Sequence, residues 1–387
     1  MNMLIKKSLL LYCIVIALIG AYVQIAMIAL IDDSGSSLSS LIKLVIIVIS
    51  ILYGLKNNVS RTSMYNYWLF WCLWIIFDFY VLGMKGVGMS NLFHALFPAC
   101  CYFMFYHFFS KNKISKYHLI GFLLLWLETV YLNYRTTFFV DGLVLGSDAI
   151  VSNMIFWNIC FIPFLLLLKN NPLKITLLVI SFMLSLISGK RSASICVGLI
   201  VIFTIYPLLK NKSNSLKIGI ISLFFTLILL GYNYLSFYFG YIVNRINDSD
   251  PDGNGRLPIY QKVLNTYEDG DFISILFGNG YNSIYNIIGT NAHNDALQML
   301  FDYGIVGFFF YVAFICLAFK NVIKSRRYSQ NFYPSILASF LIIIVLGMVS
   351  NLYAFNSYFA FICSIFGMYE GNLNNNNNVY INCNSRV

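Results

Sequence analysis

The sequence predicts an all-α, polytopic integral membrane protein of about twelve transmembrane helices with one large extramembrane loop. The first observation is composition: of 387 residues, 59% are hydrophobic and 10% are charged, whereas soluble domains are about one-quarter charged. The second is the recurrence of apolar segments long enough to cross a bilayer. The third is the way cations are distributed among the connections between those segments.

The first apolar segment runs from Ser8 to Ile31 without a charge. It exceeds the core of a signal peptide and suffices to cross roughly 30 Å of hydrocarbon, so we predict a retained first span. The twelve predicted spans are residues 8–31, 39–55, 65–84, 91–110, 118–134, 150–168, 175–189, 193–209, 218–240, 295–319, 335–352 and 354–369.

Charge predicts the orientation of these spans. With a cytoplasmic N-terminus, the cytoplasmic connections hold most of the 25 lysines and arginines, as the positive-inside rule requires. The net charge of +10 is then mainly a topology signal. No domain shows a basic face interleaved with aromatic residues, so we predict no nucleic-acid partner.

This threading defines three regions. Residues 1–369 form a single transmembrane domain, and within it residues 241–294 form one long periplasmic loop with short helices. Loops of that length are usually functional or disordered, and the Gly-rich turns around a helical stretch in this loop favour order. The segment 370–387, which contains "NNNNN", is predicted to be a disordered cytoplasmic tail.

Polar groups from separate segments converge on the predicted periplasmic side. "ISGKRSAS" supplies Lys190 and Arg191, the long loop supplies Arg256, and the tenth span begins near His293. Guanidinium groups bind phosphate oxygens through paired hydrogen bonds, so these cations are candidates for holding an anion such as a lipid-linked diphosphate. The alternative is that Lys190 and Arg191 only flank a turn and reach lipid headgroups.

His293 follows Thr290 and Asn291, which we predict to cap the tenth span. The partial positive charge of a helix start disfavours imidazolium, and a neutral imidazole can act as a general base. The alternative is an interfacial histidine that is merely hydrogen-bonded. Further along, Gly304 and Gly307 predict a flat strip for a neighbouring helix or a lipid chain.

Three carboxylates, Asp78, Glu128 and Asp302, fall in the outer halves of predicted spans, where they need a partner. We expect them to pair with the arginines; a glycosidase-like catalytic pair is the alternative. No cysteine or histidine cluster has metal-ligand spacing. "DSDPDG" resembles the start of an EF-hand loop, but Ile259 stands where a bidentate Glu is needed. We therefore expect neither a metal nor a cofactor.

Taken together, three motifs resemble those of the bacterial O-antigen polymerase and O-antigen ligase superfamily of membrane glycosyltransferases. They are "HNDALQMLFDYGIVG", with its His-Asn, nine residues, Gly, two residues, Gly pattern; "GNGRLPIYQKVL" in the large loop; and "SGKRSA" at an earlier outer turn. Their order and the predicted spans also agree, so the resemblance extends over most of the chain.

The resemblance implies roles for particular residues. Arg191 and Arg256 would bind the donor diphosphate, and His293 would activate or position the acceptor hydroxyl. Two departures stand out: Tyr260 occupies a position where the family often has Trp, and no loop arginine has Gly at the Arg, ten residues, Gly spacing of some polymerases. The supporting candidates are Lys190, Arg245, Tyr260, Asn294 and Asp302.

By this resemblance the expected activity is O-antigen polymerisation for lipopolysaccharide, with undecaprenyl-diphosphate-linked oligosaccharides as donor and acceptor. The implied setting is the inner membrane, with both termini cytoplasmic, the active site periplasmic, and a chain-length regulator and a flippase as further partners. Two alternatives stay open: an O-antigen ligase that transfers glycan to lipid A core, and a lipid-linked oligosaccharide flippase. Against a flippase, the polar groups gather at one face and the long loop occurs once, whereas transporters often show repeated halves.

Overall fold

The computed structural model describes residues 3–29, 36–56, 61–83, 89–135, 154–188, 190–209, 256–353 and 356–384. All regular structure within these residues is helical. The first group of helices is α1 (Met3–Ala29), α2 (Ser36–Lys56), α3 (Ser63–Phe77) with a π-helical turn η2 (Asp78–Gly83), α4 (Met89–Phe109), α5 (Lys116–Arg135), α6 (Ile155–Leu165), α7 (Asn171–Ile187) and α8 (Arg191–Leu209). The second group is α11 (Arg256–Glu268), α12 (Phe272–Phe277), α13 (Ser283–Ile288), α14 (Asp295–Tyr328), α15 (Tyr333–Val349) and α16 (Asn356–Asn384).

Every predicted apolar segment within the described residues coincides with a helix, and the predicted ninth span, residues 218–240, lies outside them. Four helical stretches are long and apolar enough to cross a membrane: Ser8–Ala26, Ser37–Lys56, Met89–Phe109 and Asp295–Tyr328. Shorter apolar helices are α6, α7, α8 and α15. The all-helical, membrane-type fold is confirmed, while the count of twelve spans stays a prediction.

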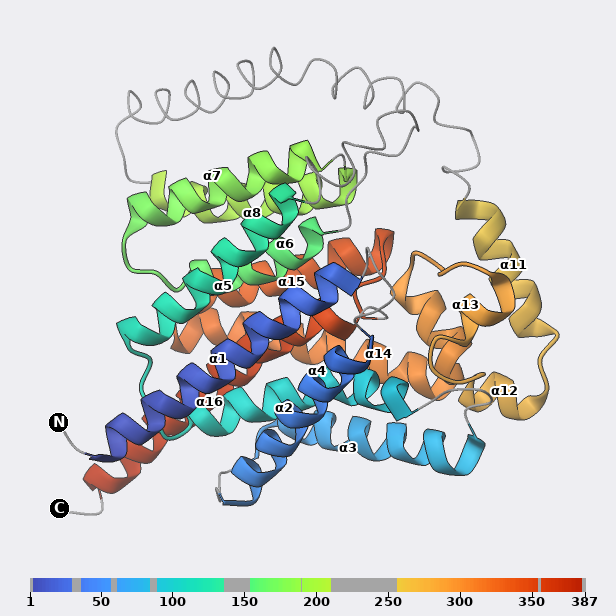
Figure 1. Ribbon diagram of the computed structural model, residues 1–387, viewed down its shortest axis with the longest axis horizontal. Coiled ribbons are helices and arrows are strands. Elements are labelled where there is room, and N and C mark those ends of the chain that lie inside the picture. Colours follow the sequence, from blue (N-terminus) through green and yellow to red (C-terminus); the bar gives the residue numbers. More distant parts are fainter. Residues whose placement is uncertain are drawn as a thin grey trace, which may run out of the picture.

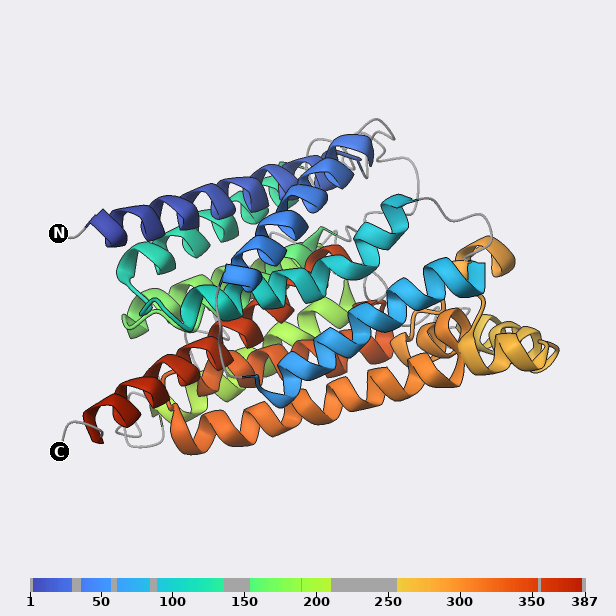
Figure 2. The same cartoon turned by 90° about the horizontal axis from the view of Figure 1, so that it is seen from below.

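The helices form a bundle with two distinct ends. Both termini lie at one end, and the short helices α11, α12 and α13 gather at the other (Figures 1 and 2). The long helix α14 runs along the bundle from the short helices toward the end with the termini (Figure 2). Antiparallel α7 and α8 pack against each other along one edge, and α8 also packs on α15.

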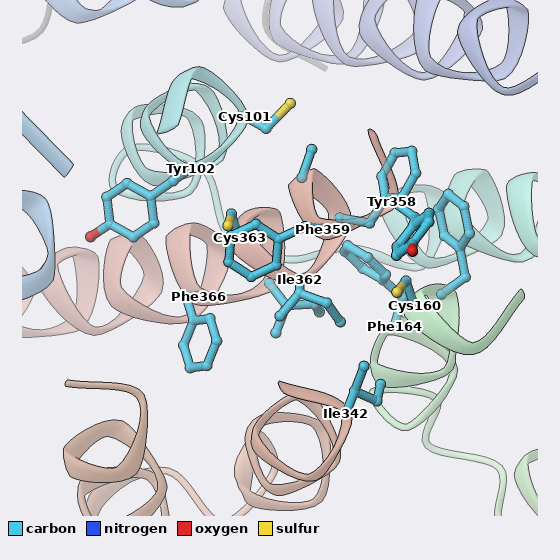
Figure 3. Packing of buried hydrophobic residues seen from close by; sticks show 14 of the residues in the cluster. Cys101, Tyr102, Cys160, Phe164, Ile342, Tyr358, Phe359, Ile362, Cys363 and Phe366 are labelled. Atoms are coloured by element: carbon cyan, nitrogen blue, oxygen red, sulfur yellow. The ribbon is translucent and has the colours of Figure 1, made fainter. Parts of the chain in front are cut away.

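The core centres on α6, α4 and α16. Every residue of α6 is buried, so this short helix is a core element surrounded on all sides, although the sequence predicts a full span over residues 150–168. Around it, Cys363 and Phe359 of α16 pack near Cys160 of α6 and Ile342 of α15 (Figure 3). Such interdigitation supplies the dispersion contacts that hold helices together when lipid surrounds them.

Helix α16 packs most extensively against α4, and two glycines make the approach possible. A Cβ at Gly367 would lie 2.3 Å from the Tyr102 carbonyl oxygen, and one at Gly371 would lie 2.4 Å from that of Tyr106. The helix continues to Asn384, past residue 369 where the sequence predicts the start of a disordered tail. Burial explains the continuation, because Glu370 takes hydrogen bonds from Tyr102 (2.6 Å) and from Asn321 (3.0 Å) inside the bundle.

Candidate functional site

Helix α11 positions Arg256 through an apolar stripe on the face that the arginine shares. Ile259, Val263 and Tyr267 recur every fourth residue, and Arg256 begins the helix three residues before the first of them. The stripe packs on a small buried cluster made by α13, the segment before α14 and α14 itself: Ile284, Ile288, Ala292, Leu297 and Phe301. The packing therefore fixes α11, and with it Arg256, beside the start of α14.

Helix α14 is broken at Gly304, whose φ of 66° and ψ of −163° are not helical. The break is filled by the end of α12 and the loop that follows it: a Cβ on Gly304 would lie 2.5 Å from the Leu276 carbonyl and 2.6 Å from the Gly278 nitrogen. Backbone carbonyls near the break accept bonds from this loop, Phe301 from the Asn279 N–H (3.2 Å) and Asp302 from the Gly280 N–H (2.8 Å). The glycine thus serves a backbone break and not the flat packing strip that we predicted.

The Asp302 side chain ties the same loop to α14. One carboxylate oxygen accepts from the Ser283 hydroxyl (2.9 Å) and the Ile284 N–H (3.1 Å), and the other accepts from the Asn282 N–H (3.2 Å) and the Gln298 amide (2.7 Å). Asp302 is buried, with 3% of its surface exposed. Its role in the fold is to hold the first part of α14 rigidly against α13.

The expectation that the carboxylates pair with arginines is wrong for the described residues. All four donors to Asp302 are neutral, and the buried Asp78 side chain has an oxygen without a hydrogen-bond partner among the described residues. Glu128 lies against Gly20 of α1 and interacts with Gln24. At Asp302, four neutral donors occupy both carboxylate oxygens and take the place of a cation.

His293 lies immediately before α14 in an uncommon backbone conformation. Its φ is 53°, in the left-handed region that residues other than glycine rarely adopt. The cap of α14 is Asn294, whose side-chain oxygen accepts from the Leu297 N–H (3.2 Å), and not Thr290 or Asn291 as predicted. His293 therefore lies outside the helix, and the backbone turn at this residue is of the kind that clusters at functional sites.

Three segments supply charge around this histidine. Burial, then the positive charge of Arg256, then that of Lys190 lower the pKa of His293 below its ordinary value. Lys190 precedes the first residue of α8, so a cation from the α7–α8 turn and one from α11 both act on the imidazole. The ring is half-buried, and neither ring nitrogen has a hydrogen-bond partner within the described part of the chain. Burial and two cations therefore both favour the neutral form of this imidazole.

The other candidate residues lie at different places relative to His293, Arg256 and Lys190. Arg191 is the first residue of α8, next to Lys190, while Tyr260 is half-buried on α11, one turn after Arg256. Arg245 lies outside the described residues. In the described ranges, no three His, Cys, Asp or Glu side chains come together in a way that would hold a metal ion.

Sequence reasoning missed the "GNG" segment 278–280, which docks into the break of α14. A signal was present, since two glycines flank an asparagine ahead of a short helix, but the motif gives no hint of its partner. It also missed Lys43, which is fully buried on α2 and contacts His94 of α4. The ammonium lies 5.0 Å from the centre of the Tyr22 ring, a cation–π distance.

The comparison with family models bears on this end of the molecule. Residues 176–312 match the family model described as O-antigen ligase. Over this stretch the chain is similar to that family. The stretch includes all the candidates named above that lie in the α7–α8 turn, in α11 and around the start of α14. The resemblance to the O-antigen polymerase and ligase superfamily, whose members are membrane glycosyltransferase-like enzymes, is confirmed over this region. No curated protein matches the chain.

Proposed function

We propose that the protein is an O-antigen polymerase, which joins undecaprenyl-diphosphate-linked oligosaccharide repeat units on the periplasmic face of the inner membrane. The observation that carries this proposal is the meeting of His293 with the charges of Arg256 and Lys190, which come from separate elements. A transfer from a lipid diphosphate needs a base for the acceptor hydroxyl and cations for the departing phosphate charge. These residues match both needs.

In the proposed mechanism, His293 accepts the proton of the acceptor sugar hydroxyl as the oxygen attacks the donor anomeric carbon. The lowered pKa supports this role because the imidazole is then neutral at neutral pH. Arg256 and Arg191, with Lys190 beside them, bind the diphosphate and stabilise the negative charge that develops as it departs. Tyr260 is available to stack on a sugar ring, and Asn294 and Asp302 keep the segment around His293 in place.

A sugar diphosphate carries its own leaving group, so the reaction needs no nucleotide sugar, metal or cofactor. The lipid-linked unit serves as donor and as acceptor, and its lipid explains why a bilayer enzyme carries out the step. The termini are cytoplasmic in this proposal, since they lie at the end of the bundle opposite the α11–α13 group (Figure 1). A chain-length regulator and a flippase would act with the enzyme.

The second candidate is an O-antigen ligase, which the description of the matched family model favours directly. The two activities share a donor and differ in the acceptor, which is lipid A core oligosaccharide for the ligase. A flippase is the third candidate, and it would require polar groups near the middle of the membrane. We favour an enzyme over a flippase because the charges of Arg256 and Lys190 both act on His293, which lies at the start of α14 near the short helices α11 to α13 (Figure 1).

The test is elongation in vitro with the purified protein in detergent, the cognate undecaprenyl-diphosphate repeat unit and gel separation of products. We expect a ladder from the wild type and at least a hundredfold lower rate from His293→Ala and from Arg256→Ala, as is typical for loss of a general base or of charge stabilisation. Arg327→Ala is the matched control, because Arg327 is an exposed arginine near the opposite end of α14. It should retain the wild-type rate.

Other outcomes identify the alternatives. Transfer to lipid A core without a ladder would make the protein a ligase, with the same residues at its site. Neither product, with a verified cognate unit and a folded protein, would contradict both enzymatic proposals and favour the flippase. A ladder that survives His293→Ala would remove His293 from the mechanism.

A further inference from the structure

A cavity of about 410 Å³ lies between α7, α8, α14 and α15, away from the His293 site. Its lining from α8 and α15 is mostly apolar and follows one face of each helix: Ile200, Phe203, Thr204 and Pro207 on α8, and Tyr333, Pro334, Leu337, Ala338 and Leu341 on α15. Protein interiors contain few voids larger than a water molecule. The cavity beside the contact between α8 and α15 therefore leaves room for an occupant.

The remaining lining residues give the cavity a basic, polar mouth. They are Lys174 from the first turns of α7, Arg326 from the last turn of α14, and Gln330. Arg326 and Gln330 are exposed, and Phe203 on the wall is half-exposed, so the cavity opens to the surface. Neither cation has a carboxylate partner within the part of the chain that the structure describes.

We propose that this cavity binds an anionic phospholipid, with the headgroup phosphate on Lys174 and Arg326 and an acyl chain along the α8 and α15 faces. Charge complementarity and the apolar wall together select this occupant, because a free phosphate would leave the wall uncovered. A zwitterionic lipid would lack the net negative charge that two cations attract. Basic pockets between transmembrane helices are a known type of lipid headgroup site.

The location gives the lipid a structural consequence. Lys174 lies near the start of α7, and the other end of that helix leads into the turn that carries Lys190 and Arg191. A lipid in this cavity would lie between the α7–α8 pair and the α14–α15 pair, at the far end of α7 from Lys190. Lys174 and Arg326 both lie outside the stretch that matches the family model.

The test measures lipid binding directly, by thermal shift and by native mass spectrometry of the purified, delipidated full chain. The probes are dioleoylphosphatidylglycerol, dioleoylphosphatidylcholine with the same chains, and glycerol phosphate. We expect the phosphatidylglycerol to raise the unfolding temperature and to remain bound, and the other two to do neither. Equal effects of both lipids would overturn the charge selection, and an effect of glycerol phosphate alone would overturn the acyl-chain site.

Variants locate the site. Lys174→Gln with Arg326→Gln should weaken phosphatidylglycerol binding roughly 25-fold, from about fivefold per basic residue. The matched control is Lys320→Gln with Arg327→Gln, which removes two charges from α14 outside the cavity lining and should change binding less than twofold. Ala338→Leu, which fills the wall, should also weaken binding. If wild type binds neither lipid, the cavity is covered by another part of this chain, such as residues 210–255, and the proposal is wrong.

Discussion

The two ends of the bundle both gather cations, yet they present them to different neighbours. At one end, Lys190 and Arg256 act on a neutral imidazole, and a network of backbone hydrogen bonds holds the segment in place. Near the other end, Lys174 and Arg326 stand at the mouth of an apolar cavity. A basic cluster alone thus predicts affinity for an anion at both ends.

What distinguishes an end proposed to carry out a reaction from an end proposed only to bind an anion is the imidazole and the rigid backbone that holds it. His293 has an uncommon backbone turn, a helix cap directly after it and a break in the helix at Gly304, eleven residues further on. The cavity end has no comparable device within the described residues, and its helices α7, α8 and α15 are continuous. We therefore expect changes in backbone support to lower activity when they are made at the first end. The same kind of change at the second end should have little effect on activity.

The largest effect is expected from Gly304→Ala. The new Cβ would lie 2.5 Å from the Leu276 carbonyl. The alanine would also have to adopt the positive φ of 66°. Backbone strain of about 1–2 kcal/mol and overpacking of about 1–3 kcal/mol together should lower stability by several kcal/mol. Thermal unfolding in detergent and the elongation rate are the two measurements, and both should fall.

Gly289→Ala is the matched control for that change. Gly289 has a positive φ of 87° with a ψ of 0°, in place of the −163° of Gly304, and a Cβ there meets nothing within 4 Å, so it controls for a positive φ without crowding. We expect a loss of about 1–2 kcal/mol from backbone strain alone. Equal losses in the two variants would mean that the docking of the 278–280 loop into the break contributes nothing beyond the glycine conformation.

An intermediate effect is expected from Asp302→Asn, compared with Glu370→Gln. Each carboxylate oxygen of Asp302 accepts from a backbone N–H, which can only donate. In Asp302→Asn, the side-chain NH₂ group would therefore face a donor in either orientation of the amide. Glu370 instead receives two hydroxyls, from Tyr102 and Thr62, on one oxygen, and those hydroxyls can reverse to accept from an amide. We expect a loss of about 1–3 kcal/mol for Asp302→Asn and at most about 1 kcal/mol for Glu370→Gln.

The readout for this pair is unfolding temperature together with kcat. Asp302→Asn should lower both, because it loosens the segment that carries His293 from the loop 278–284. Glu370→Gln should leave kcat of the folded protein unchanged. If Glu370→Gln reduces kcat as much as Asp302→Asn does, the claim that activity depends specifically on the hydrogen bonds near His293 is wrong.

The sequence predicts the helices well and their contacts poorly. Composition and apolar segment length are local properties, so helices appear wherever the described residues hold a predicted span. The failures come from tertiary context. Residues 150–168 read as a span, but α6 is shorter and buried on all sides, and the predicted tail after residue 369 begins as helix because Glu370 finds partners inside the bundle.

For the candidate site, motif spacing located Arg256 and His293 but not what holds them together. The spacing of three and then four residues predicts that Arg256, Ile259 and Val263 share a face, but it does not predict the partners of that face on α13 and α14. Gly304 does not have the role that the sequence predicts, because a glycine in an apolar helix indicates close packing as readily as a break. Long-range pairs such as Gly280 with Asp302 have no local signature.

The smallest effect is expected in the pH dependence of elongation, where Lys190→Gln is compared with Lys174→Gln. Burial and the charges of Arg256 and Lys190 lower the pKa of His293, so activity should be present at neutral pH and lost as pH falls through that lowered value. Removing the Lys190 charge raises the pKa toward its ordinary value, and the acid limb of the kcat profile should move to higher pH. Lys174 is a cation of the other end, and its substitution should leave the limb in place.

Raised salt should move the wild-type limb in the same direction as Lys190→Gln, because it screens the same half-exposed charges. A limb that is unmoved in Lys190→Gln, or that moves equally in Lys174→Gln, would mean that the titrating group is not His293 beside its two cations.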